Sequence, residues 1–340
     1  MELLEVENLY KEFYKDKIKF AAVDHIHFSI REGECLGLVG ESGCGKSTTA
    51  SLIAGLLKPD KGTFRFFGEE LTKSSSRRIR KNIQMIFQNP MDSFDPRYHL
   101  LSSVQQGLRY VEKCDKRELE RRAQEAISFV GLKESYYKKP IHQLSGGECQ
   151  RAAIARAIIG QPKLLICDEA TSALDPNTTH AILTLIKDIN KKLGITVVVI
   201  THQMSVVEEI CDSVAILDGG VVVEQGEVRE IFANPKTAAA RRLVAPNGGS
   251  AARDLSSFAP DDHVVRVTFN GSSAAKPLVA SLAAEKGILV SVLSADTRDL
   301  SGQCYGSMLL KLPRDTEQAK QAAAYMRSQN GVTVEEVTGE

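Results

Sequence analysis

The chain has 340 residues, of which 25% are charged, and its 43 Lys and Arg residues balance its 43 Asp and Glu residues. A neutral chain without Trp lacks the basic face and the stacking surface that nonspecific nucleic-acid binding needs, so nucleic acid is not an expected partner. No apolar run approaches the ~18 residues of a membrane span, and the acidic N-terminus does not resemble a signal peptide. Seven scattered cysteines are typical of a reduced, cytosolic protein, and the length allows two domains.

The first 30 residues alternate apolar and polar side chains, which predicts strands joined by a hairpin. We place Phe13 and Tyr14 in the turn between these strands. An aromatic ring there could stack on an adenine ring or could anchor the loop, and both interpretations fit the sequence.

A glycine-rich stretch at residues 40–48 follows an apolar strand at 35–39 and precedes a helix predicted over 47–57. It fits G-x-x-x-x-G-K-[ST], in which glycines let several backbone N–H groups converge on one polyphosphate. The helix N-terminus adds partial positive charge. The alternative is a glycine-rich turn with an incidental lysine. We expect nucleotide contacts from Gly40, Glu41, Ser42, Gly43, Cys44, Gly45, Lys46, Ser47 and Thr48. Lys46 can reach the β- and γ-phosphates, and the Ser47 hydroxyl can ligate Mg²⁺.

Two apolar strands end in polar side chains, at the edge of an α/β sheet where ligands bind. The strand at residues 83–87 ends at Gln88, which could contact Mg²⁺ or the attacking water, or could simply cap a turn. The strand at 163–167 ends at Asp168 and Glu169. One carboxylate there can hold Mg²⁺ through water, and the second can accept a proton from the attacking water.

A third buried strand, residues 195–200, is followed by Thr201 and His202. Its position at the same sheet edge allows the imidazole to contact a γ-phosphate, although a lone histidine is more often structural. Residues 100–137 carry the periodicity and charge of a solvated helical subdomain.

Ser145 and Glu148 have the S-x-x-E spacing of a capping box at a helix start. An ordinary capped helix is therefore one interpretation. The paired glycines at 146–147 weaken a first helical turn, and they make sense if phosphates approach the backbone there. Residues 172–175, which end at Asp175, form a turn before another helix.

Residues 244–262 have the composition of a linker, and the pattern restarts after them. Strands are predicted at 264–269, 288–295, 304–312 and 332–337, and helices at 277–286 and 315–327. The order is β-α-β-β-α-β, which is the ferredoxin-like arrangement. This part lacks a catalytic constellation, so it is interpreted as a binding or dimerisation module over 263–340.

With these motifs in place, residues 1–243 resemble the ATP-binding-cassette ATPases, an α/β P-loop NTPase fold with a helical subdomain at about 89–160. The resemblance rests on GESGCGKST at 40–48, Gln88, LSGGE at 144–148, KLLICDE at 163–169, SALD at 172–175 and His202. It implies that two copies face head to tail and enclose two ATP molecules.

The resemblance also implies a role for each matched residue. Ser47, Gln88 and Asp168 would hold Mg²⁺, and Glu169 would be the base, with Gln88 and His202 beside it. Phe13 would stack on adenine. Ser145, Gly147 and Asp175 would contribute to the composite nucleotide site that the second copy completes.

The second domain resembles the NIL domain of methionine-importer ATPases, most closely in VVRVTFNGSSAAKPLVASLAAEKG. The resemblance implies that these domains pair, bind methionine between them and slow transport when substrate is plentiful. The ligand would lie near Ser291 and Met308. Ser291 replaces the asparagine that the resemblance leads us to expect.

The leading hypothesis is the ATPase subunit of an importer of methionine or a related amino acid. Such a subunit would dock through residues 88–101 on a transmembrane permease dimer at the cytoplasmic face of the membrane, and an extracytoplasmic substrate-binding protein would deliver the substrate.

Three alternatives remain open. GESGCGKST and FQNPMDSFDPR at 87–97 also resemble the cassettes of oligopeptide, dipeptide and nickel importers. A soluble, non-transport cassette ATPase is disfavoured, because the chain has one cassette and no sustained heptads. The C-terminal domain could also be a dimer brace without a ligand.

Overall fold

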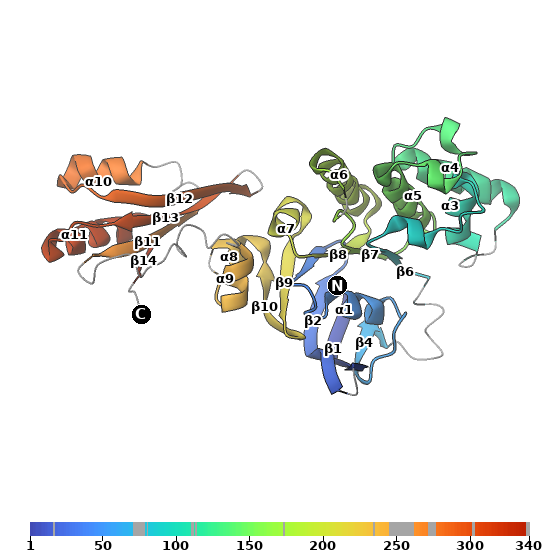
Figure 1. Cartoon of the computed structure of the whole chain (residues 1–340), viewed down its shortest axis with the longest axis horizontal. Helices are drawn as coiled ribbons and strands as arrows, with labels where there is room; N and C mark the ends of the chain where they lie inside the picture. Colours follow the sequence, from blue (N-terminus) through green and yellow to red (C-terminus); the bar gives the residue numbers. More distant parts are fainter. Residues whose placement is uncertain are drawn as a thin grey trace. The chain divides into compact units, whose positions relative to one another are not determined.

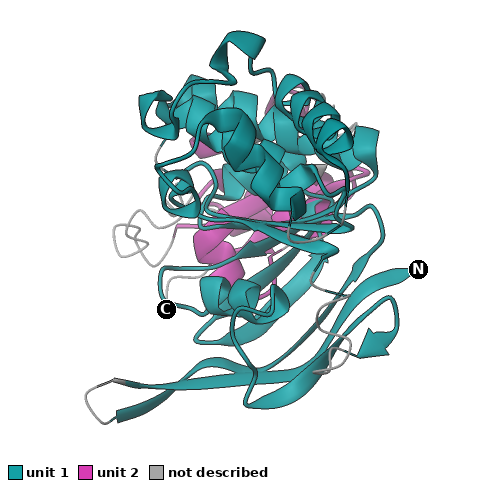
Figure 2. Ribbon diagram, turned by 90° about the vertical axis from the view of Figure 1, so that its right-hand side faces the viewer, with its two compact units in different colours: residues 1–228 teal, residues 229–340 magenta. Residues whose placement is uncertain are grey.

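The computed structural model describes residues 1–15, 18–70, 79, 81–109, 112, 114–172, 174–233, 235–244, 262–270, 277–300 and 303–337. The chain divides into two compact units, residues 1–228 and 229–340, which Figure 2 colours separately. The predicted domain limits at 243 and 263 stay predictions, and all but the two end residues of the predicted 244–262 linker lie outside the described residues. Among the described helices, none combines the length and apolar character that crossing a bilayer requires.

A six-stranded sheet is the centre of the first unit, with the order β10-β9-β3-β8-β7-β6. Figure 1 labels its strands β6, β7, β8, β9 and β10. Its strands are β3 (Cys35–Val39), β6 (Ile83–Ile86), β7 (Leu164–Asp168), β8 (Thr196–Thr201), β9 (Ser213–Asp218) and β10 (Val221–Glu227). All neighbours pair in parallel except β9 and β10. Every residue of β3, β7 and β8 is buried, because a parallel sheet is covered on both faces. The parallel strands therefore bring their carboxyl ends to one edge.

A second sheet of the first unit has the order β2-β1-β4-β5. Its strands are β1 (Glu2–Lys15), β2 (Ile18–Arg31), β4 (Lys61–Phe66) and β5 (Glu69–Glu70). The placement of Phe13 in a turn was wrong, because β1 continues to Lys15 and Phe13 pairs with Phe20 of β2.

Helix α1 (Lys46–Ile53) begins directly at the end of the glycine-rich stretch, as predicted. It ends four residues earlier than the predicted Leu57. Ala54 is its C-cap and Gly55 adopts a φ of 69°, so the chain leaves the helix well before Pro59.

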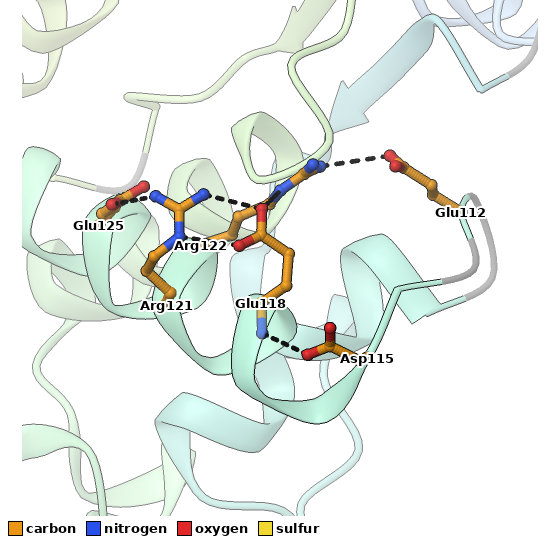
Figure 3. A network of polar contacts seen from close by, with 6 residues as sticks. All are labelled: Glu112, Asp115, Glu118, Arg121, Arg122 and Glu125. Atoms are coloured by element: carbon orange, nitrogen blue, oxygen red, sulfur yellow. Dashed lines mark hydrogen bonds and ion pairs between the residues drawn. The ribbon is translucent and has the colours of Figure 1, made fainter.

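The predicted helical subdomain contains α3 (Leu100–Arg109), α4 (Lys116–Phe129) and α5 (Gly146–Ile158). Short 3-10 segments, η1 (Pro90–Ser93), η2 (Glu134–Tyr136) and η3 (Ile141–Gln143), lie between them or before them. Asp115 caps α4 by accepting from the Glu118 backbone N–H at 2.9 Å. Figure 3 shows that Glu118 also pairs with Arg121 and Arg122, which holds the pKa of its carboxyl down to about 2. These pairs are exposed, so they confirm the solvated face and add little stability.

Helices α6 (Pro176–Leu193) and α7 (Met204–Ile210) complete the first unit. Two apolar clusters form its core, one containing the helical subdomain and α6, the other lying between β1, β2 and the α1 side of the large sheet. The boundary between the two units falls between Val228 and Arg229, at the start of helix α8 (Val228–Ala233). Helix α9 (Ala238–Val244) follows in the second unit.

The rest of the second unit confirms the ferredoxin-like order. Its elements are β11 (Val264–Asn270), α10 (Leu278–Lys286), β12 (Ser291–Leu300), β13 (Gln303–Lys311), α11 (Thr316–Arg327) and β14 (Val332–Glu336). The sheet order is β12-β13-β11-β14, and all its pairs are antiparallel. The strand predicted at 288–295 instead starts at Ser291 and runs to Leu300, because Ile288 packs into the core from the connecting loop.

Candidate functional site

The phosphate-binding loop lies between β3 and α1. The Lys46 side chain is buried, and its Nζ donates to the carbonyl oxygens of Gly40 and Glu41, both at 2.8 Å. Gly45 adopts a φ of 102°, and a Cβ there would lie 2.1 Å from the Ala22 carbonyl oxygen. Only glycine therefore fits at this position, where the loop turns into the helix.

A hydroxyl and a carboxylate meet where the loop approaches β7. Ser47 Oγ donates to Asp168 Oδ1 at 3.1 Å. Burial raises the pKa of the Asp168 carboxyl above its usual value, while the Ser47 hydrogen bond acts in the opposite direction. Hydroxyl and carboxylate oxygens are ligands that Mg²⁺ prefers, so this pair fits the metal predicted from the sequence.

Glu169 is the point at which the ends of three neighbouring strands converge. Gln88, after β6, donates from Nε2 to Glu169 Oε2 at 2.9 Å. His202, after β8, lies with Nδ1 at 3.2 Å from Glu169 Oε1. Glu169 adopts a φ of 44°, and its backbone N–H donates to the Ile200 carbonyl at 3.0 Å, so the residue is fixed in a left-handed conformation. The structure thus brings the three predicted polar strand ends together.

The start of α5 is a capping box, as the S-x-x-E spacing predicted. The Glu148 backbone N–H donates to Ser145 Oγ at 3.3 Å, and the Ser145 backbone N–H donates to Glu148 Oε2 at 2.8 Å. Nearby, a Cβ at Gly147 would lie 2.6 Å from Thr178 Cγ2 of α6. Sequence reasoning missed this contact, which spans 31 positions of the chain and has no local signal.

Asp175 caps α6, with its Oδ1 accepting from the Thr178 backbone N–H at 3.1 Å. These hydrogen bonds to Thr178 keep the pKa of the Asp175 carboxyl below its usual value. Pro176 at the first helical position completes a strong helix start. Asp175 and Pro176 therefore define the start of α6.

Two phenylalanines lie opposite each other on the β1–β2 hairpin. The ring centroids of Phe13 and Phe20 are 6.1 Å apart, and Lys11 Nζ lies 5.5 Å from the Phe13 centroid. Phe20 was not among the predicted site residues. The signal that could have found it is the pairing register, which places it directly across from Phe13.

Ser291 and Met308 do not come together within one domain. Ser291 of β12 pairs with Lys311, whereas Met308 of β13 pairs with Ala295 and packs against the helix-side core. Because paired residues share a face and neighbouring β13 residues alternate, the two predicted ligand positions lie on opposite faces of the sheet.

Comparisons with known proteins match both parts of the chain. The sequence model of the ABC transporter family matches residues 23–172, and that of the NIL domain matches residues 263–336. The methionine import ATP-binding protein MetN of Aliivibrio fischeri is 38% identical over 342 residues, which cover 96% of each chain. The protein of the same name from Bacillus subtilis is 37% identical over 334 residues, which cover 95% of each chain.

Solved structures resemble the first part of the chain. The ATP-binding cassette MJ0796, a dimer in a post-hydrolysis state with ADP and Pi, is 30% identical with a TM-score of 0.61, and the match covers 66% of this chain and 99% of that one. CbiO1 from Clostridium perfringens, part of the ABC transporter complex cbiONQ, is 31% identical with a TM-score of 0.62, and the match covers 72% and 96%. The chain belongs to the family of ABC transporter ATP-binding proteins that carry a C-terminal NIL domain.

Proposed function

We propose that this chain is the ATPase subunit of an ABC importer that takes up methionine or a closely related amino acid. Support comes from relatives named methionine import ATP-binding proteins, which align over 95–96% of the chain, and from the match of the NIL domain. The oligopeptide or nickel importer alternative rests on the cassette motifs at 40–48 and 87–97 alone.

The geometry around Glu169 supports ATP hydrolysis. In the proposed reaction, a water oxygen attacks the γ-phosphorus, Glu169 accepts the water proton, and the bond to the bridging β–γ oxygen breaks to release ADP and phosphate. Gln88 and His202 each contact one oxygen of the carboxylate, so its orientation is restrained from two sides. Lys46 would exchange its loop carbonyls for phosphate oxygens.

Mg²⁺ would be held by Ser47 and Asp168, with the Gln88 amide oxygen as a further ligand. When bound, the ion neutralises charge on the β- and γ-phosphates. The chain's own contribution is to place the Asp168 carboxylate in a buried position, where it accepts a hydrogen bond from Ser47 that partly offsets the effect of burial on its pKa.

The complete site is proposed to require a second copy of the chain. Ser145 and Gly147 of that copy would face the γ-phosphate, with Asp175 at the dimer contact. The dimeric cassette MJ0796, to which this chain is 30% identical, supports this arrangement. Residues 88–101 would dock on a transmembrane permease dimer at the cytoplasmic face, an extracytoplasmic protein would deliver substrate, and the NIL domain would sense it.

The observation that carries the proposal is the double support of the Glu169 carboxylate by Gln88 and His202. Glu169→Gln should lower ATP turnover by about 10²-fold or more, since it removes the base, while ATP binding is retained. Glu125→Gln, which removes an exposed carboxylate of α4, is the matched control. Light scattering should show a dimer of the Glu169→Gln chain in ATP. Turnover at the rate of the control would contradict the assignment.

The substrate class is tested separately, by calorimetry on the full-length chain. We expect saturable heat with methionine and none with a dipeptide or Ni²⁺. Heat with a dipeptide and none with methionine would favour the peptide importer, and no heat with any of them would favour a dimer brace.

A further inference from the structure

The β1–β2 hairpin presents a second aromatic ring beside the one predicted from the sequence. Phe20 pairs directly with Phe13, and the two rings are tilted by 33°. Phe20 remains 45% exposed, so part of its ring is open to a ligand. The pair therefore offers a continuous aromatic surface of two rings rather than one.

The hairpin that carries the two rings lies against the phosphate loop, since the Ala22 carbonyl of β2 borders Gly45. Lys11 and Phe13 lie on the same face of β1, because the Lys11 ammonium lies over the Phe13 ring. Leu9 is buried in the same apolar cluster as Cys44 of the loop. Tyr14, one residue after Phe13, lies on the opposite face and is 71% exposed.

The distance from the ring pair to the loop suits a nucleotide. The Ala22 carbonyl of β2 touches the backbone at Gly45, as the 2.1 Å separation from a Cβ there shows. Phe20 is two residues before Ala22, which corresponds to about 7 Å of strand. A base attached through ribose to phosphates in the loop spans this order of distance.

Lys11 limits how much of the Phe13 ring is available for stacking on a base. Its ammonium lies over the Phe13 ring and is held there by Asp60 at 2.9 Å. One approach to Phe13 is therefore covered by a charge. We propose that Phe20 supplies the remaining stacking surface, so that Phe13 and Phe20 together form the platform for the nucleobase. This inference rests on the proposed ATPase function and adds a positioning residue to it.

The test compares two ligands on the full-length chain. Calorimetry is done with a non-hydrolysable ATP analogue and with inorganic tripolyphosphate, which lacks a base. Phe20→Ala should weaken binding of the analogue by about fivefold or more and leave tripolyphosphate unchanged, because base–aromatic stacking is lost and the loop is intact. A guanine analogue should be weakened to a similar extent, since every base offers a π-face.

Further variants separate stacking from a structural role of the ring. Phe20→Tyr should retain binding, whereas Phe20→Leu, which keeps apolar bulk, should bind as weakly as Phe20→Ala. Tyr14→Ala is the matched control on the other face and should bind like the wild type. Equal affinity of Phe20→Ala and wild type for the analogue would overturn the inference, as would a parallel loss of tripolyphosphate. If the wild-type chain binds neither ligand, the ATPase proposal itself fails.

Discussion

Gly147, in the first turn of α5, lies so close to Thr178 of α6 that a Cβ atom there would be 2.6 Å from Thr178 Cγ2. The glycine is therefore required for packing within one chain, whether or not it also faces a nucleotide. Gly147→Ala should lower the melting temperature, because the overlap costs roughly 1–3 kcal/mol and exceeds the gain in helix propensity.

A second substitution identifies the cause. Thr178→Ser removes the Cγ2 methyl, so the Gly147→Ala, Thr178→Ser double variant should recover most of the lost melting temperature in thermal unfolding. If the double variant melts as low as Gly147→Ala alone, the packing explanation is wrong. ATP turnover of the double variant then reports separately on the proposed contact with the second copy.

Ser145 caps α5 and is also proposed to face the nucleotide of a second copy, and a pair of substitutions can separate the two roles. Ser145→Ala removes the cap of α5 and should cost about 1 kcal/mol of stability. Ser145→Asp keeps a capping oxygen and places a negative charge at a helix N-terminus, so stability should be retained. The added charge would face the triphosphate of the second copy, and ATP turnover should fall. Turnover by Ser145→Asp equal to wild type would argue against the composite site.

The capping box should also leave a signature in the dependence of stability on pH. The backbone N–H of Ser145 and the hydroxyl of Tyr136 lower the pKa of the Glu148 carboxyl from its ordinary 4.5. Because the Glu148 pKa is lower in the folded chain than in the unfolded chain, its carboxylate contributes its full stabilisation above about pH 4.5. This stabilisation is lost as the pH falls through the pKa of the folded chain.

Glu148→Gln should therefore reduce the fall in melting temperature between pH 6 and pH 4 relative to wild type. Glu125→Gln, whose carboxylate is exposed on α4, serves as the reference for general acid effects. Identical pH profiles of wild type and Glu148→Gln would show that the capping carboxylate contributes nothing measurable.

The sequence predicted the parts of the site that depend on strand ends and local caps. Gln88, Asp168 and His202 each follow an apolar run, and parallel pairing carries such ends to one edge. The strand order was not predictable, because an apolar run in the sequence does not indicate which strands will pair with it. The β6-β7-β8 order is what places Gln88 and His202 on either side of Glu169.

Features that depend on distant pairing or on a single irregular residue were missed. Phe20 follows from the hairpin register, and the contact of Gly147 with Thr178 follows from the packing of two helices. In the second unit, the register shift between Val292 and Ser294 changes the alternation of β12. A pattern of alternating side chains does not reveal such a bulge.

Met308 and Ser291 lie on opposite faces of the sheet that contains β12 and β13, so substituting them should have different effects. Met308 packs against the apolar core of the second unit, so Met308→Ala should lower its stability by roughly 1–2 kcal/mol, less than for a fully buried Met. Ser291 is exposed on the other face, and Ser291→Ala should leave the melting temperature unchanged. Any weakening of methionine binding by Ser291→Ala then reports a ligand contact. If calorimetry shows weaker binding only for Met308→Ala, and only in step with its lower stability, then the ligand does not lie at either position.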